Sequence, residues 1–107
     1  MDRYTYRVSW SDDDGEYVGI CIEFPSLSWL DSSHEKAFKG IRKVVAEVIA
    51  DMEANNEKLP DPIAAKKFSG KFQVRIPSEL HRELAISAAE QNISLNRLIS
   101  SRLAAHV

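Results

Sequence analysis

Polar and apolar residues alternate strictly from Lys71 to Ile76. An extended strand would place the three polar side chains on one face, and these are Lys71, Gln73 and Arg75. Side chains of these types pair with base edges in the major groove of DNA, which is wide enough to admit a two-stranded β-ribbon. One chain supplies only one strand of such a ribbon. We therefore expect a second copy of the chain to supply the other strand.

Two short amphipathic helical patterns follow this strand and would hold it in place. Pro77 ends the strand because it has no backbone N–H, and Ser78 and Glu79 supply a capping hydroxyl and a first-turn carboxylate for a helix. Asn92 suits the left-handed turn that closes this helix, and Ser94 caps the next one. The apolar stripes of the two helices are Leu80, Leu84, Ala85 and Ala88, then Leu95, Leu98, Ile99 and Leu103.

The segment from Phe68 to Val107 is short for an independent domain. It holds 40 residues, near the size below which a chain rarely folds alone without disulfides or metal. Pairing of two chains would supply the missing core. The residues that we expect in this shared dimer core are Phe72, Val74, Ile76, Leu84, Leu98 and Ile99.

From Gly70 onward, the order of strand, helix, turn and helix resembles the ribbon-helix-helix family of transcriptional regulators. The resemblance implies that two strands pair antiparallel and enter the major groove, with Lys71, Gln73 and Arg75 reading bases. It also implies that the start of the second helix rests on a phosphate, where backbone N–H groups and the helix dipole favour an anion. It assigns this phosphate anchor to Ser94, Leu95, Asn96 and Arg97. The alternative is a half-exposed edge strand with solvated Lys and Arg, which the six-residue pattern by itself favours.

Charge divides the chain into two parts. From Lys66 onward there are seven Lys and Arg against three Glu, a balance of +4. The residues before Lys66 hold seven basic and thirteen acidic groups, a balance of −6, so the net charge of −2 conceals the division. A basic segment suits phosphate binding, whereas an acidic one repels DNA and suits a basic protein partner.

The acidic part predicts a small α+β domain that begins with a β-hairpin. Alternating residues before and after a turn at Ser11 to Gly15 indicate two strands with one buried face. Pro25 and Ser26 are expected to break the second strand, and Leu27 to Leu30 to form a third. The apolar positions of the hairpin are Tyr4, Tyr6, Val8 and Trp10, then Val18, Ile20, Ile22 and Phe24.

A long helix follows, capped by Ser32 or Ser33, with Glu35 in capping-box spacing after Ser32. Asn55 and Asn56 can end it, and the prolines that come next cannot continue it. We therefore expect domains at residues 1–62 and 70–107, joined by a linker at 63–69. The stripe of the helix that should pack on the sheet is Phe38, Ile41, Val45, Val48, Ile49 and Met52.

Several segments together resemble the HicB antitoxin family and its ribbon-helix-helix branch. They are the acidic turn with Tyr17-Val18-Gly19, then Glu23-Phe24-Pro25-Ser26-Leu27, Asp31 to Ala37, Ser69 to Phe72, Leu80 to Arg82, and Ser94 to Arg97. The resemblance implies a degenerate ribonuclease-H-like N-terminal domain that binds and blocks HicA, a small basic toxin that cleaves mRNA. It also implies a C-terminal domain that represses the operon of both proteins. Trp29 and Lys36 depart from the family, which often has a small and an acidic residue there.

Other candidate chemistry is weaker. The three consecutive carboxylates could suggest the metal site of a nuclease, and they are Asp12, Asp13 and Asp14. A two-metal site, however, gathers carboxylates from separate elements around one point. Consecutive turn residues point in different directions, so they do not form such a site. The three histidines, His34, His81 and His106, lack a nucleophile at a recognisable spacing. We therefore expect no catalytic residue, no metal, no cofactor and no enzymatic activity.

The remaining features indicate a cytoplasmic protein with no membrane contact, because no apolar run reaches membrane-spanning length. Cys21 should be a small buried or half-buried residue. Trp10 and Trp29 could anchor a partner, although aromatics in a small domain more often fill its core. The expected function is that of a homodimeric or tetrameric antitoxin that binds a HicA-type toxin and operator DNA. The alternative is a free-standing regulator whose N-terminal domain senses a ligand or mediates oligomerisation.

Overall fold

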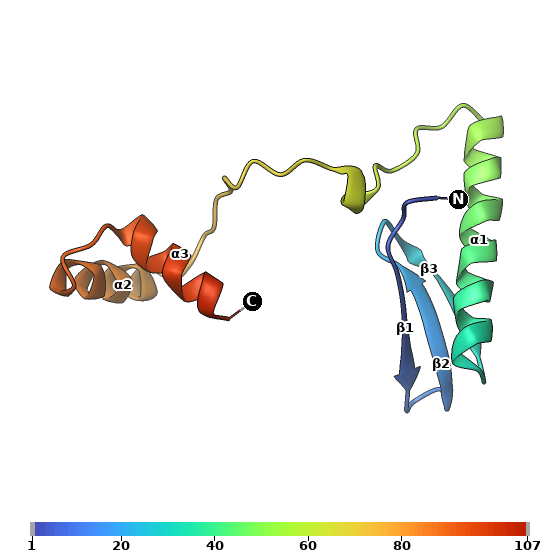
Figure 1. Ribbon diagram of the computed structural model, residues 1–107, viewed down its shortest axis with the longest axis horizontal. Helices are drawn as coiled ribbons and strands as arrows, with labels where there is room; N and C mark the ends of the chain where they lie inside the picture. Colours follow the sequence, from blue (N-terminus) through green and yellow to red (C-terminus); the bar gives the residue numbers. More distant parts are fainter. Residues whose placement is uncertain (1, 107) are drawn as a thin grey trace. The chain divides into compact units, whose positions relative to one another are not determined.

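The structure is a computed structural model that describes residues 2–106. The chain divides into two compact units, Met1–Ser69 and Gly70–Val107, which we call the N-terminal and C-terminal units. A three-stranded antiparallel sheet comes first, followed by three α-helices (Figure 1). The expected α+β class is therefore confirmed. Within residues 2–106, no helix is both long enough and apolar enough to cross a membrane.

The sheet of the N-terminal unit has the order β1-β2-β3. Its strands are β1 (Tyr6–Ser11), β2 (Glu16–Cys21) and β3 (Phe24–Asp31). The predicted first turn forms as expected: Gly15 adopts φ 64° and donates its N–H to the carbonyl of Ser11 at 2.9 Å. Glycine favours this left-handed conformation because it has no side chain to clash with the backbone.

The second strand ends earlier than predicted. β2 stops at Cys21, and Phe24 opens β3, which continues through Pro25 and Ser26 instead of being broken by them. The pairing between β2 and β3 is irregular at Ile20 and Cys21. Because β3 lies at the sheet edge, Pro25 can be accommodated there without the loss of a central ladder bond.

The expected buried face of β2 was also wrong. Gly19 and Cys21 are buried, whereas Val18 and Ile20 lie on the opposite face and are only half-buried, and Ile22 follows the strand in an exposed position. A Cβ atom at Gly19 would lie 2.6 Å from the carbonyl oxygen of Ala37. The helix packs so close to β2 that only glycine fits beneath it, which outweighs the apolar character of Val18 and Ile20.

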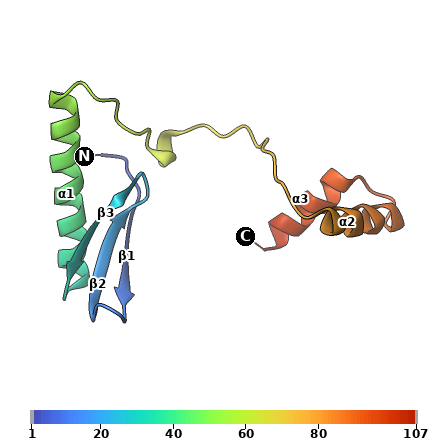
Figure 2. The same cartoon turned by 180° about the vertical axis from the view of Figure 1, so that it is seen from behind.

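The long helix α1 (His34–Ala54) lies along one side of the sheet in both views (Figures 1 and 2) and contacts all three strands. Ser33 is its N-cap, since the Ser33 hydroxyl accepts the N–H of Lys36. Asn55 caps the other end, as predicted. The core cluster is Cys21, Phe24, Ile41 and Val45, with Val48, Ile49 and Met52 packed against it. Phe38 belongs to the predicted stripe but lies at its exposed margin.

Gly40 gives α1 a second close contact with the sheet. A Cβ atom here would clash with the indole ring of Trp29. The Trp29 indole therefore packs directly against Gly40 and stays 38% exposed, so it does not fill the core. The large residue at position 29 is accommodated by the absence of a side chain at position 40.

The C-terminal unit contains α2 (Ser78–Glu90) and α3 (Leu95–Ala105). The predicted turn is confirmed, since Asn92 has φ 58° and Ile93 donates its N–H to the carbonyl of Ala88 at 3.0 Å. Ala88 and Leu98 are buried. The predicted capping role of Ser78 was wrong: Pro77 occupies the cap position of α2, and no side chain caps the helix. Glu79 lies in the first turn as expected.

Candidate functional site

The predicted base-reading segment, Lys71–Ile76, forms no strand in the single chain. A strand is defined by its ladder of hydrogen bonds, and one copy offers no neighbouring strand for this segment. Its residues are all exposed, including the three predicted base readers Lys71, Gln73 and Arg75. The strand is therefore absent from the single chain, and its pairing with a second copy stays a prediction.

The apolar side chains of this segment are also exposed. Phe72 is 73% exposed, Val74 is 66% exposed and Ile76 is 38% exposed. Monomeric proteins seldom leave contiguous apolar surface of this kind open to water. In contrast, Leu98 is buried, and Leu84 and Ile99 are half-buried. Three of the six residues expected in the dimer core are therefore buried or half-buried within one chain, and the other three are exposed.

A groove of about 370 Å³ separates this segment from α3. Phe72 and Val74 line one side of it, and Ile99 and Leu103 on α3 line the other. Lys71, Asn96 and Ser100 add polar atoms to this apolar lining. Exposed and groove-lining apolar side chains thus form one continuous surface of the C-terminal unit.

The start of α3 has the geometry expected of an anion site. The Ser94 hydroxyl accepts the N–H of Arg97 at 3.0 Å, and the Ser94 carbonyl accepts the N–H of Leu98 at 3.0 Å. Helix geometry leaves the N–H groups of Leu95 and Asn96 with no carbonyl one turn earlier to donate to. These two donors and the helix dipole favour a phosphate, and Arg97 adds a positive charge to the same turn.

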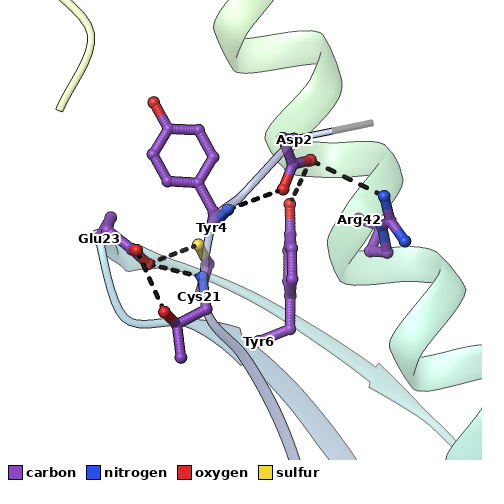
Figure 3. Close-up of polar contacts among 7 residues, drawn as sticks. Asp2, Tyr4, Tyr6, Cys21, Glu23 and Arg42 are labelled. Atoms are coloured by element: carbon purple, nitrogen blue, oxygen red, sulfur yellow. Dashed lines mark hydrogen bonds and ion pairs between the residues drawn. The ribbon is translucent and has the colours of Figure 1, made fainter. Parts of the chain in front are cut away.

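The N-terminal unit holds a polar cluster that the sequence did not predict (Figure 3). The carboxylate of Glu23 accepts the N–H of Thr5 and the N–H of Ile63, each at 2.9 Å, and the Thr5 hydroxyl at 3.2 Å. The hydroxyl of Tyr4 donates to the carbonyl of Pro60 at 2.7 Å. These hydrogen bonds connect the residues just before β1, Tyr4 and Thr5, to the segment after α1 at Pro60 and Ile63. No sequence signal links Glu23 to Ile63, which lies 40 residues away.

The same figure shows a second anchor beside α1. Asp2 accepts the hydroxyl of Tyr6 at 2.8 Å and lies 4.0 Å from the guanidinium of Arg42 (Figure 3). Burial and the hydrogen bond to Asp2 raise the pKa of Tyr6. Arg42 also lies over the rings of Tyr6 and Phe38, at 5.5 and 5.6 Å from their centres. These contacts hold the N-terminal segment against the helix.

The Glu23 contacts predict a pH-dependent loss of stability. Burial acts to raise the pKa of Glu23, but the hydrogen bonds from Ile63 and Thr5 outweigh it and hold the pKa below its ordinary 4.5. The stabilisation is therefore fully present above pH 4.5 and disappears as the pH falls through the lower folded-state pKa. We expect Glu23→Gln to cost about 1 kcal/mol at pH 7 and nothing at about pH 2, measured by urea unfolding. Glu35→Gln, which removes only an exposed pair with Lys39, is the control and should change stability less at either pH.

Two of the three aspartates of the first turn are engaged in local hydrogen bonds. Asp12 accepts the indole N–H of Trp10 at 2.7 Å, and Asp14 accepts the hydroxyl of Ser11 at 2.9 Å. Among residues 2–106, no cluster of three or more His, Cys, Asp or Glu could hold a metal ion. His34 packs edge-on against Tyr17, at 5.5 Å between ring centres. Cys21 is buried as expected, and this burial raises the pKa of its thiol.

Comparison with known proteins adds one finding. Residues 53–103 match the model of the HicB family. The match supports membership of the HicB family. No curated protein and no solved structure matches the chain.

The HicB match runs from the end of α1 through α2 and into α3. It therefore spans the exposed segment Lys71–Ile76 and the start of α3 described above. HicB proteins are antitoxins and are not known as enzymes. Most of the HicB match lies in the C-terminal unit, and the whole sheet lies before Glu53, outside the match.

Proposed function

We propose that this protein is an antitoxin that binds and neutralises a HicA-type toxin, an mRNA-cleaving enzyme, and that it represses its own operon by binding operator DNA. The match of residues 53–103 to the HicB family carries this proposal. The site itself supports the DNA-binding part, because a basic exposed segment and the start of α3 offer base-reading and phosphate-binding groups together.

The proposed DNA-binding form is a homodimer. Two copies of Lys71–Ile76 pair as antiparallel strands and thereby cover Phe72, Val74 and Ile76. The large exposure of these apolar side chains in the single chain supports this pairing. Lys71, Gln73 and Arg75 then face the major groove, and the residues Ser94 to Arg97 meet a backbone phosphate.

The proposed toxin-binding part is the N-terminal unit. Its support is charge, since the residues before Lys66 carry a balance of −6 and HicA-type toxins are basic. Surface carboxylates such as Asp12, Asp13 and Glu47 lie on exposed positions of the turn and the helix. Opposite charge steers two proteins together and raises their rate of association.

Co-expression tests the antitoxin function directly. The full chain is expressed together with any short, basic open reading frame that adjoins its gene, and growth is scored. Restored growth and formation of a complex are the expected results. If the chain binds its own promoter but neither binds nor neutralises the neighbour, the free-standing regulator is the better account.

Substitution of Arg75 tests the base-reading assignment. Arg75→Ala is expected to remove roughly 1–3 kcal/mol of discrimination between the promoter and a scrambled duplex, because its guanidinium pairs with a base edge. Gel-shift titrations on both duplexes measure the difference. The control is Lys67→Ala, which removes a basic residue outside the strand and should weaken binding to both duplexes equally. An Arg75→Ala protein that keeps its sequence preference would refute the assignment.

A further inference from the structure

A row of aromatic side chains lies at one end of the N-terminal unit, where the turn between β1 and β2 and the start of α1 come together (Figures 1 and 2). Trp10 is paired with Tyr17, and their rings meet edge to face with 5.1 Å between ring centres. Tyr17 also contacts His34, the first residue of α1, at 5.5 Å. Trp10 lies on the edge strand and is 52% exposed. We call this region the Trp10 surface, defined by Trp10, Asp12, Asp13, Tyr17 and His34.

The Trp10 indole is exposed and yet held in place. Its N–H donates to the Asp12 carboxylate at 2.7 Å, and Tyr17 supports the ring from the neighbouring strand. A side chain that is already ordered loses little conformational freedom when a partner binds. Exposed tryptophans of this kind are frequent anchor points in protein interfaces. The hydrogen bond also brings a negative charge to the edge of the ring.

Carboxylates are concentrated around the Trp10 surface. From Trp10 to Glu35 the sequence holds seven Asp and Glu and no Lys or Arg. One of the seven, Glu23, belongs to the polar cluster of Figure 3, near the other end of β1. The other six are Asp12, Asp13, Asp14, Glu16, Asp31 and Glu35. Within residues 2–106, only Glu35 of these six forms an ion pair, with Lys39. The chain thus leaves five negative charges here without a cation.

An exposed indole beside unpaired carboxylates selects a cationic ligand. The face of an indole attracts a guanidinium or ammonium group, and a nearby carboxylate accepts its hydrogen bonds. Arginine suits both groups, because its planar guanidinium can stack on a ring while it donates to a carboxylate. RNA bases could also stack on the ring, but the carboxylates repel the phosphates. Lys36 and the positive end of the α1 dipole oppose a cation, yet they offset only about one and a half of the five charges.

We infer that the Trp10 surface binds an arginine side chain of a basic protein partner. The guanidinium packs on the Trp10 ring and donates to the Asp12 carboxylate, and the Asp13 carboxylate adds attraction. The inference deepens the proposed function and rests on it for the identity of the partner, the basic toxin. The preference for arginine rests on the contacts and charges of the Trp10 surface alone.

A synthetic peptide of eight arginines tests this preference with the full chain. Its affinity is measured by isothermal titration calorimetry and compared with that of a peptide of eight lysines. The arginine peptide is expected to bind about fivefold more tightly, because an ammonium group neither stacks flat on a ring nor donates two parallel hydrogen bonds. Equal affinities for the two peptides would overturn the inference.

Substitutions then locate the bound arginine. Trp10→Leu should weaken binding of the arginine peptide about tenfold and Trp10→Phe less, because phenylalanine keeps a ring that attracts cations more weakly. Asp12→Asn should also weaken binding, although its amide oxygen can still accept the indole N–H. The matched control is Asp61→Asn, which removes the same charge from an exposed position after α1 and should have a smaller effect. The emission of Trp29 on heating reports whether each variant is folded. Unchanged binding by Trp10→Leu, or equal losses for the two asparagine variants, would contradict the site.

The basic protein encoded next to the gene separates this inference from the proposed function. If the unsubstituted chain binds that protein, Trp10→Leu should weaken the complex about tenfold and leave promoter binding unchanged. An unchanged complex would overturn the inference and leave the antitoxin function standing. If the unsubstituted chain binds the arginine peptide through Trp10 but does not bind the neighbouring protein, the antitoxin function fails and the arginine site remains.

Discussion

Gly19→Val is expected to unfold the N-terminal unit. A Cβ atom at this position would lie 2.6 Å from the backbone oxygen of Ala37 and 2.9 Å from a methyl group of Ile41. Because Ala37 and Ile41 are both fully buried, neither can move away without displacing α1 from the sheet. Overpacking by even one methylene group costs about 1–3 kcal/mol, and valine adds three carbon atoms. This loss is large for a unit of this size.

Tryptophan fluorescence measures this effect selectively. Both tryptophans of the chain, Trp10 and Trp29, lie in the N-terminal unit. The Gly19→Val protein should lose the cooperative fluorescence change on heating. Gly15→Asn is the matched control, since no atom lies within 4 Å of its Cβ position and asparagine tolerates the positive φ. A Gly19→Val protein that melts like the Gly15→Asn protein would contradict the close packing of α1 on β2.

Val74→Asp is expected to abolish DNA binding while leaving the N-terminal unit folded. Val74 is exposed in the single chain, so the substitution costs little there. In the proposed dimer, the carboxylate would be buried against the partner strand without a partner charge, which costs several kcal/mol and shifts the equilibrium to separate chains. The expected fall in affinity for the promoter is at least about a hundredfold.

Light scattering coupled to size-exclusion chromatography measures the mass of the same protein. Val74→Thr is the control, because threonine keeps the branched shape and introduces only a hydroxyl, so it should retain most of the binding. Unchanged tryptophan fluorescence would show that the N-terminal unit is intact. If Val74→Asp keeps both the mass and the promoter affinity of the unsubstituted chain, strand pairing through this face is refuted.

Local signals in the sequence predicted local structure well. Gly15 in the first turn, Ser33 before α1, Asn92 between the last two helices and Ser94 before α3 all adopt the expected conformations. Each of these residues acts within a few positions of itself, through a positive φ or a hydrogen bond to a nearby N–H. A pattern of neighbouring residues is enough to identify them.

Features that depend on distant contacts were predicted less well. Alternation in β2 predicted that Val18 and Ile20 face the core, but the packing distance of α1 places Gly19 and Cys21 there. The Glu23 carboxylate binds backbone N–H groups of Thr5 and Ile63, which no pattern brings together. Trp10, a residue of a type that often fills small cores, is 52% exposed and held by Asp12. The alternation of Lys71–Ile76 is a local pattern, but a strand there would need a second chain, and the single chain has none in this segment.

The exposure of Phe72, Val74 and Ile76 in the single chain has a consequence for gene control. Under the proposed pairing, the species that binds DNA contains two chains, while most chains remain single at low concentration. The amount of this species then rises with the square of the chain concentration. A twofold drop in chain concentration therefore lowers it about fourfold. Repression would then respond to changes in protein synthesis or turnover more steeply than in simple proportion to protein abundance.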